Sequence, residues 1–194
     1  MKIYTRGGDK GTTSTLDGRE KKFAPVFDLL GDLDELSAHI GELCALFGAK
    51  ELGSGPDTTY NNELRTIQKR IYDLNALLST NNPSRRERMT RMDGEPVKCL
   101  ESYIDSMTDQ TPPLKDFILP GVTIHDAKAQ VCRSVARRAE RKMWQFLEES
   151  PDYLNQHESS YVNRLSDFFF ALARYYCALA RRADICAKYY EKET

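Results

Sequence analysis

The chain has 194 residues, a formal net charge of −1, 40% hydrophobic residues and 29% charged residues. This length predicts one domain with a sizeable core, and the balanced charge excludes a general nucleic-acid binder, which would be strongly basic. No stretch approaches the about 18 uncharged apolar residues that a transmembrane helix needs. The N-terminal residues MKIYTRGGDKG contain neither an apolar signal core nor an arginine- and serine-rich presequence.

The glycine-rich N-terminus, YTRGGDKGTTS over residues 4–14, is the first distinctive segment. Its glycines allow close backbone approach, and its hydroxyls and cations suit a loop whose N–H groups wrap an anion. The segment lacks the GxxxxGK[ST] pattern of a Walker A loop. Its composition is equally compatible with a disordered terminus.

Apolar residues then recur at alternating steps of three and four, which places one apolar face on each of five predicted helices. These stripes run over residues 26–47, 64–78, 97–107, 129–146 and 165–179, and strand signals are nearly absent. Breakers at 53–56 (GSGP), 81–84 (NNPS) and 111–113 (TPP) separate the first four helices. The arginine-rich segment 85–95 is expected to be a solvated connection. The pattern predicts an all-α, left-handed antiparallel five-helix bundle.

Cysteine and histidine usage argues against a metal centre. The count of cysteines is odd and their spacing matches no zinc pattern, which favours buried thiols in a reducing compartment. The cysteines are Cys44, Cys99, Cys132, Cys177 and Cys186. The histidines, His39, His125 and His157, form no HExxH pair, so a transition metal bound by the protein is not expected.

Two helical segments carry polar residues in patterns that suit a ligand. Arg133, Arg137, Glu140 and Arg141 share one helix face, beside the apolar seam. Clustered guanidiniums can clamp a polyphosphate through bidentate hydrogen bonds, although a solvated basic face gives the same pattern. We expect some of these arginines to be half-buried.

In the last helix, Asn163 and Asp167 lie one turn apart. They could hold an arginine, a ribose hydroxyl or Mg²⁺ through water. Spacing alone favours a simpler role, in which they cap and solvate the first turn of that helix. The run Phe168-Phe169-Phe170 is interpreted as core, with one of its rings pointing away from the main seam.

Five collinear motifs together resemble one family. YTRGGDKGTTSTL, GDLDELSAHIG, FILPG, CRSVARRAER and YVNRLSDFFFALAR are similar to the motifs of ATP:corrinoid adenosyltransferases of the propanediol-utilisation class. The resemblance implies a five-helix bundle that forms a homotrimer, with ATP bound between neighbouring subunits. The implied reaction transfers the 5′-deoxyadenosyl group of ATP to the Co(I) of cobalamin and releases triphosphate.

The resemblance also implies roles for individual residues. The ATP-binding positions are Thr5, Arg6, Gly7, Gly8, Asp9, Lys10, Gly11, Thr12, Thr13, Lys22, Arg137, Glu140, Asn163 and Asp167. On the corrinoid side, Asp34 and Arg133 match an ion pair, and Phe117 matches the aromatic ring beneath the corrin. Arg137, Arg133, Asp34 and Phe117 are the expected catalytic residues. Mg²⁺ is expected on the ATP phosphates, with Glu140 or Asp167 as candidates to hold it through water.

The chain departs from the family pattern at a few positions. The loop reads GGDKG where TGDKG is usual, Ser37 stands where bacterial members often have Asn, and Ala136 replaces a common cysteine. Val122 replaces a glycine of the usual LPGG turn, which alters a loop on the corrinoid side. None of these changes removes a charged group that the chemistry needs.

The expected organisation is a single domain over residues 1–194, with a nucleotide-binding loop (1–22), the bundle (23–188) and a frayed tail (189–194). Expected partners are ATP, cob(I)alamin or cob(II)alamin, a reductase and an adenosylcobalamin-dependent mutase, with no nucleic acid or membrane. The expected compartment is the cytoplasm of a bacterium or the mitochondrial matrix of a eukaryote.

Two alternative functions share the fold. The chain could be a non-catalytic nucleotide-binding helical trimer, or a chaperone that delivers adenosylcobalamin. The joint presence of Asp34, Arg133 and Phe117 argues against the first, because nucleotide binding alone does not require them.

Overall fold

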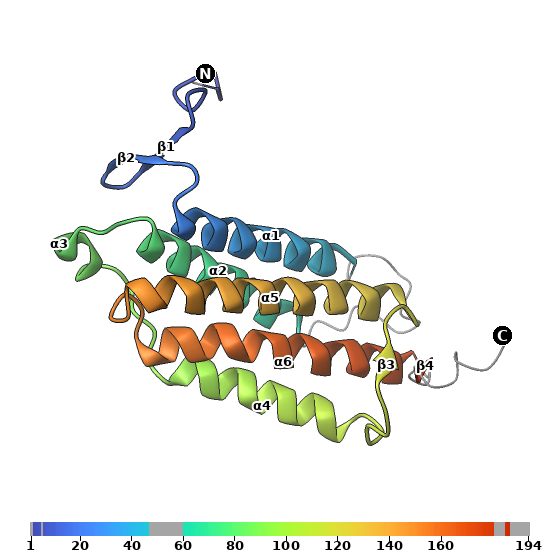
Figure 1. Ribbon diagram of the computed structural model, residues 1–194. Helices are drawn as coiled ribbons and strands as arrows, with labels where there is room; N and C mark the ends of the chain where they lie inside the picture. The colour runs from blue at the N-terminus through green and yellow to red at the C-terminus, as the bar shows by residue number, and fades with distance from the viewer. Residues whose placement is uncertain (1, 5, 47–59, 181–184, 187–194) are drawn as a thin grey trace.

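The computed structural model describes residues 2–4, 6–46, 60–180 and 185–186 (Figure 1). Its helices are α1 (Pro25–Leu46), α2 (Asn61–Leu78), α3 (Pro83–Arg86), α4 (Glu95–Asp109), α5 (Ile124–Glu149) and α6 (Gln156–Leu179). Its strands are β1 (Thr12–Thr15), β2 (Gly18–Lys21), β3 (Ile118–Leu119) and β4 (Ile185–Cys186). Thr5, the predicted GSGP linker at 53–56 and the predicted tail at 189–194 lie outside the described residues. No described helix is both long and apolar enough to cross a membrane.

The five long helices correspond to the five predicted stripes, and α3 adds a single short turn. Helix α1 packs against α2 and α5, and α6 lies between α5 and α4 (Figure 1). Consecutive long helices alternate in direction, as predicted. Because only α5 separates them in this order, the neighbours α4 and α6 run parallel, with Glu101 beside Arg164 and Pro112 beside Arg174.

The core consists of the apolar stripes that the sequence predicts. Buried leucines and isoleucines of α1 and α2 share one core cluster with large aromatic side chains of α6. Phe168 and Phe169 are 0% exposed and meet edge to face, with centroids 5.4 Å apart. Phe170 is only partly buried, so the prediction that one ring of the run points away is confirmed.

Capping residues fix where α5 and α6 begin. Thr123 and Asp126 form a capping box at α5, and Asn155 and Glu158 form one at α6. Helix α6 therefore begins at Gln156, well before Asn163. The interpretation of Asn163 and Asp167 as first-turn caps is wrong, because Asn155 already accepts the backbone N–H of Glu158 at 2.9 Å.

The connection between α2 and α4 is largely solvated, as its charge predicts, with Arg85, Arg88 and Arg91 exposed. Several of its arginines also have partners. Arg91 donates two hydrogen bonds to Glu158, from Nε at 2.6 Å and from Nη2 at 2.8 Å. The Arg86 guanidinium lies 3.6 Å from the centre of the Tyr153 ring. Arg85 lies 3.6 Å from a carboxylate oxygen of Asp17. These partners, which are distant in the sequence, tie an exposed connection to the hairpin and to the start of α6.

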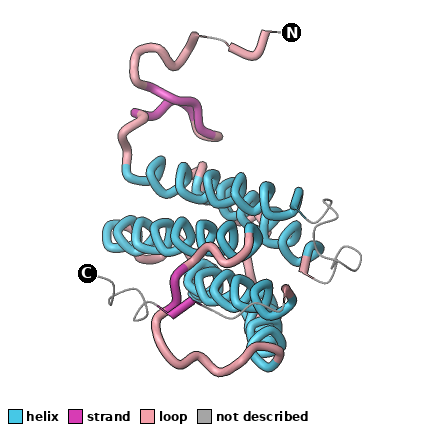
Figure 2. The backbone as a smooth tube through the Cα atoms, turned by 90° about the vertical axis from the view of Figure 1, so that its right-hand side faces the viewer, coloured by secondary structure: helices cyan, strands magenta, loops and turns pink. Residues whose placement is uncertain are grey.

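The N-terminal segment contains a β-hairpin, which corrects the expectation of almost no strand. Strands β1 and β2 pair antiparallel, with Thr12 opposite Lys21 and Thr15 opposite Gly18. Figures 1 and 2 show this hairpin projecting from the bundle beyond the start of α1. Strands β3 and β4 pair antiparallel near the opposite end of the bundle (Figure 1).

Cys44 and Cys132 are buried, free thiols, Cys177 is buried, and Cys99 is partly buried. Burial raises the pKa of the Cys132 thiol to about 12, so it stays protonated at neutral pH. Over the described parts of the chain, no group of three or more histidine, cysteine, aspartate or glutamate side chains is arranged to hold a metal ion.

Candidate functional site

The glycine-rich loop before β1 is a hydrogen-bonded turn. The Asp9 N–H donates to the Arg6 carbonyl at 3.4 Å, and the Gly11 N–H donates to the Gly8 carbonyl at 3.2 Å. The turn requires positive φ at Gly11 (77°), which glycine adopts without strain, and at Arg6 (57°). Arg6, Asp9 and Lys10 are exposed. The loop therefore presents both backbone N–H groups and cationic side chains to its surroundings.

Lys22 follows β2 at the open end of the hairpin, beside this loop. Its backbone N–H donates to the Gly11 carbonyl at 3.0 Å, and its ammonium group lies close to Gly8. The structure thus brings together two predicted ATP-binding elements, the glycine loop and Lys22. Exposed cations on a glycine-rich turn suit the binding of phosphate.

Arg19 stabilises the loop, and sequence reasoning did not single it out. Its guanidinium donates to the Gly7 carbonyl, and its Nη2 and Nε lie 2.6 Å and 3.2 Å from the Thr12 hydroxyl oxygen. No motif marks this residue. Its position on β2, the strand that pairs with β1, becomes evident only in the structure.

On α5, the residues of the predicted arginine face are exposed or half-buried. Arg133 is half-buried and its Nε donates to the Gln130 side chain at 2.6 Å. Burial, followed by the nearby charge of Arg137, lowers the pKa of Arg133. Arg137 is exposed, Glu140 is half-buried, and neither side chain has a hydrogen bond or ion pair with any residue in the described ranges. The expectation of half-buried arginines thus holds for Arg133 and not for Arg137.

The opposite side of α5 is fastened to α1 by ion pairs. Arg138 donates to Asp32 at 3.0 Å and to Glu35, Lys128 lies 2.9 Å from Glu42, and Lys142 lies 3.3 Å from Asp28. These ion pairs neutralise the cations on the side of α5 that faces α1. The cations of the outward face stay available for a ligand.

Asp34 and Arg133 do not form an ion pair within the described chain, so this expectation fails for a single copy. Asp34 is exposed on α1, and Arg133 is held by Gln130 on its own helix. The physical reason is that the side of α1 that faces α5 presents Asp32 and Glu35 instead.

On α6, Asn163 and Asp167 are exposed. Asp167 accepts a 2.8 Å hydrogen bond from Arg164, which also lies 3.2 Å from Glu101 of α4. Asp167 thus lines an open groove of about 530 Å³ between α4 and α6, together with Ile104 and Phe170. Asp167 therefore lies on the side of α6 that faces α4, and it makes no hydrogen bond or ion pair with Arg137.

Phe117 precedes β3 in the connection between α4 and α5. Its side chain is 85% exposed, so it is not part of the core. Its N–H donates to the Asp116 carboxylate at 2.8 Å. The next residue, Ile118, pairs with Cys186 of β4. Backbone contacts therefore hold a large apolar ring in solvent.

The candidate site is divided within one chain. The glycine loop projects beyond the start of α1, while β3, which follows Phe117, lies at the opposite end of the bundle (Figure 1). Helix α5 carries the arginine face along the bundle between these ends. One copy therefore cannot bring the loop and Phe117 to the same ligand.

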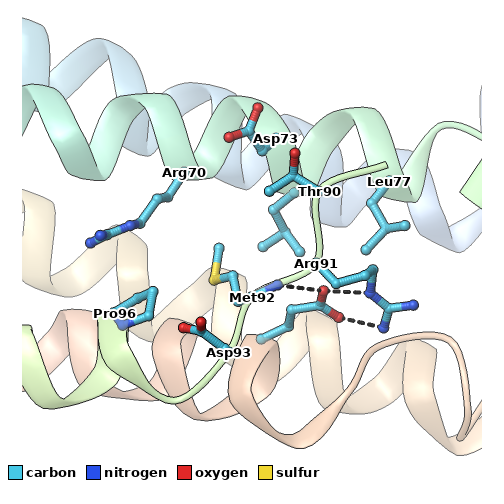
Figure 3. Close-up of a pocket in the computed structure, with 10 residues that line it drawn as sticks. Arg70, Asp73, Leu77, Thr90, Arg91, Met92, Asp93 and Pro96 are labelled. Carbon is cyan, nitrogen blue, oxygen red and sulfur yellow. Dashed lines mark hydrogen bonds and ion pairs between the residues drawn. The ribbon is translucent and has the colours of Figure 1, made fainter. Parts of the chain in front are cut away.

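A second cavity, of about 260 Å³, lies between α2, the arginine-rich connection and α6 (Figure 3). Glu158, which is 1% exposed, accepts hydrogen bonds there from the Arg91 side chain and from the Met92 N–H. Arg70 lies 3.5 Å from Glu63. Arg91 and Glu158 tie the connection to α6, and none of the predicted site residues lines this cavity.

Comparisons with known proteins agree with the motifs. The sequence model described as cobalamin adenosyltransferase matches residues 3–176. The corrinoid adenosyltransferase MMAB of Homo sapiens is 39% identical over 178 residues, which are 90% of this chain and 68% of that protein. The corrinoid adenosyltransferase of Bacillus subtilis is 34% identical over 186 residues, 95% of this chain and 91% of that protein.

A solved structure is also similar. It is a phenylalanine-to-alanine variant of the PduO-type ATP:corrinoid adenosyltransferase from Lactobacillus reuteri, complexed with cobalamin and ATP. It matches with a TM-score of 0.85 and 34% identity, and the match covers 96% of this chain and 99% of that chain. The protein described here therefore belongs to the cobalamin adenosyltransferase family.

Proposed function

We propose that this protein transfers the 5′-deoxyadenosyl group of ATP to the Co(I) of cobalamin and releases triphosphate. Family membership supports this, as does the similar structure that is complexed with cobalamin and ATP. The main structural observation in favour of the proposal is that the aromatic side chain of Phe117 is 85% exposed. A large apolar ligand would cover this ring and remove it from water, which is favourable.

The N-terminal loop is the proposed binding site for the ATP phosphates. The departing triphosphate is a polyanion, so its departure needs cations and N–H donors placed in advance. The loop supplies these from the set Thr5, Arg6, Gly7, Gly8, Asp9, Lys10, Gly11, Thr12, Thr13 and Lys22. The position of the Lys22 ammonium beside Gly8 supports this role.

Completion of the site is proposed to need a second copy of the chain. Arg137, Glu140, Asn163 and Asp167 would contribute to the nucleotide from a neighbouring subunit. The exposed guanidinium of Arg137 supports this, because it carries a charge that no described residue of its own chain neutralises. We propose a homotrimer, in which each site uses the loop of one subunit and the helices of the next. Asp34 and Arg133 would then pair across the same boundary.

Mg²⁺ fits the donor set. It prefers oxygen ligands and keeps several waters, so one or two carboxylates and the substrate phosphates are enough to bind it. Glu140 and Asp167 offer carboxylates on the outward faces of α5 and α6, and either would hold the ion through water. When bound, Mg²⁺ supplies positive charge that offsets the charge of the phosphates.

On the corrinoid side, the proposed chemistry needs little from the protein. Co(I) in a corrin is a very strong nucleophile, so the attack on the 5′ carbon needs no serine–histidine or cysteine–histidine dyad. Phe117 is proposed to displace the lower axial ligand of Co(II) and to exclude water, which makes the metal easier to reduce. A reductase would supply the electron, and an adenosylcobalamin-dependent mutase would take the product.

Chromatographic product analysis tests this function. Purified protein incubated with ATP, Mg²⁺ and chemically reduced cob(I)alamin should yield adenosylcobalamin and an equal amount of triphosphate. Binding of ATP without either product would leave a nucleotide-binding module. Tight binding of added adenosylcobalamin, again without turnover, would favour the delivery chaperone.

A further inference from the structure

Asp17 lies in the turn between β1 and β2 and joins the hairpin to the bundle. Its Oδ1 accepts a 2.7 Å hydrogen bond from the Thr80 hydroxyl. Its Oδ2 accepts from the backbone N–H groups of Asn81, at 2.5 Å, and Asn82, at 3.1 Å. Arg85 approaches the same carboxylate at 3.6 Å. All four partners belong to the segment that runs from the end of α2 through α3.

Little else holds the turn on the bundle. The Leu16 N–H donates to the Ser79 carbonyl at 3.2 Å, but the Leu16 side chain remains exposed. A cavity of about 130 Å³ separates Thr15 and Glu20 of the hairpin from Phe146 and other bundle residues. Apolar packing therefore contributes little to docking here, and the Asp17 carboxylate supplies most of the polar contacts.

The open end of the same hairpin carries the glycine loop. Arg19, two residues after Asp17, donates to the Gly7 carbonyl and to Thr12. Lys22 donates its N–H to Gly11. The hairpin ladder is short and complete. A change in the orientation of the turn would therefore move the loop with it.

We infer that Asp17 is a positioning residue for ATP: its contacts with Thr80, Asn81 and Asn82 fix the orientation in which the glycine loop is presented to the nucleotide. This inference rests on the proposed phosphate-binding role of the loop. Asp17 itself does not touch ATP. When the hairpin detaches, only a fraction of molecules present the loop correctly, and the apparent affinity for ATP falls by that fraction.

The charge of Asp17 suits this role. The Thr80 hydroxyl, the two backbone N–H groups and Arg85 lower the pKa of the Asp17 carboxyl. The group is therefore ionised at neutral pH, and hydrogen bonds to an ionised acceptor are stronger than those between neutral groups.

The test is a steady-state comparison of Asp17→Asn with the unmodified protein. If the docked fraction falls to about a tenth, the KM for ATP should rise about tenfold, while kcat at saturating ATP should change less than about twofold. Amide hydrogen exchange should become faster at Asn81 and Asn82. Glu20→Gln, on the same hairpin, is the matched control. It should change neither the KM for ATP nor the rate of amide exchange at Asn81 and Asn82.

Thr80→Val gives a second route to the same result. It removes the hydroxyl that donates to Asp17 and keeps the carboxylate, so the KM for ATP should rise by a smaller factor. If Asp17→Asn does not fold, this variant decides the question alone, and an unchanged KM overturns the inference.

Lys22→Ala separates this inference from the proposed function. If Lys22→Ala leaves the KM for ATP unchanged, the phosphate-binding role of the loop is wrong. If Lys22→Ala raises the KM while Asp17→Asn speeds amide exchange without raising it, the loop does bind ATP and only the role of Asp17 is wrong. A fall in kcat at unchanged KM would also overturn the role of Asp17.

Discussion

A Cβ atom added to Gly8 would lie 3.1 Å from the ammonium nitrogen of Lys22 and 3.3 Å from the Thr12 carbonyl oxygen. Gly8 thus leaves the space that the lysine uses to reach the loop. The contact joins two parts of the proposed phosphate site that are separated by the whole hairpin. The absence of a side chain at Gly8 therefore allows the positive charge of Lys22 to lie beside the loop.

Gly8→Ala should displace the Lys22 ammonium, because the end of a lysine side chain moves more easily than the Thr12 backbone. We expect the KM for ATP to rise several-fold, on the order of 1 kcal/mol of binding free energy, with an unchanged Tm. ATP titration and thermal unfolding measure the two effects. Ser14→Ala, on the exposed face of β1, is the control. An unchanged KM would mean that Lys22 does not contact the nucleotide from this position.

Arg137→Ala should impair ATP use without affecting folding. The side chain is exposed and unpaired within the described chain, so its removal costs little stability. Loss of a charge-assisted hydrogen bond to phosphate costs about 1.5–3 kcal/mol, or about ten- to a hundredfold in kcat/KM for ATP. Arg88→Ala removes an equally exposed arginine from the α3 region and should be silent. A normal kcat/KM in Arg137→Ala would contradict the assignment of this face to the nucleotide.

Phe117→Ala should separate the two oxidation states of the substrate. The ring is exposed, so the Tm and the binding of ATP should stay close to those of the unmodified protein. Activity that starts from Co(II) should fall steeply, since the ring is proposed to drive off the lower axial ligand before reduction. Activity with pre-reduced Co(I) should fall much less.

The opposite pattern for Phe117→Ala would be informative as well. Equal losses in both assays, together with a Tm several degrees lower, would assign Phe117 to the folding of the α4–α5 connection. Spectra of the Co(II) complex should in that case keep the same coordination state with and without the ring.

Glu63 predicts a dependence of stability on pH. Its side chain is 6% exposed, and burial raises the pKa of the carboxyl above its ordinary value of 4.5, opposed by Arg70. As the pH rises, the Glu63 carboxyl therefore loses its proton in the unfolded chain before it does so in the folded chain. The contribution of Glu63 to the free energy of unfolding is fully present below pH 4.5 and is lost as the pH rises through the pKa of the folded state.

Glu63→Gln should therefore unfold at a higher urea concentration than the unmodified protein at pH 7, and the difference should shrink as the pH falls toward 4. Glu148→Gln, at an exposed position of α5, should show no such trend. A Glu63→Gln variant that is less stable at pH 7 would mean that the Arg70 ion pair outweighs the cost of burial.

The helices and the core could be predicted because burial of one helix face imposes a period of three and four residues, as at Leu29, Leu33 and Leu36. The hairpin could not, because its strands are short, polar and largely exposed, so no alternation marks them. The pairings Asp17–Thr80 and Arg91–Glu158 join residues more than 60 positions apart. No local pattern reports such a pairing.

The candidate site divides in the same way. Helical spacing correctly placed Arg133, Arg137 and Glu140 on one outward face. Phe117 has no periodic signal and entered only through the family resemblance. The expected Asp34–Arg133 pair is absent from the described single chain, because a sequence motif does not say which copy of the chain supplies each member of a pair.

Subunit complementation tests the central claim, a site shared between copies, most directly. Lys22→Ala impairs the loop and Arg137→Ala impairs the helix face, so each variant alone should form adenosylcobalamin slowly. Co-expressed in equal amounts with different tags, they should form mixed trimers in which one site of three combines an intact loop with an intact face, recovering about a quarter of the unmodified activity. Activity no higher than that of either variant alone would contradict the shared site and place the whole reaction within one chain.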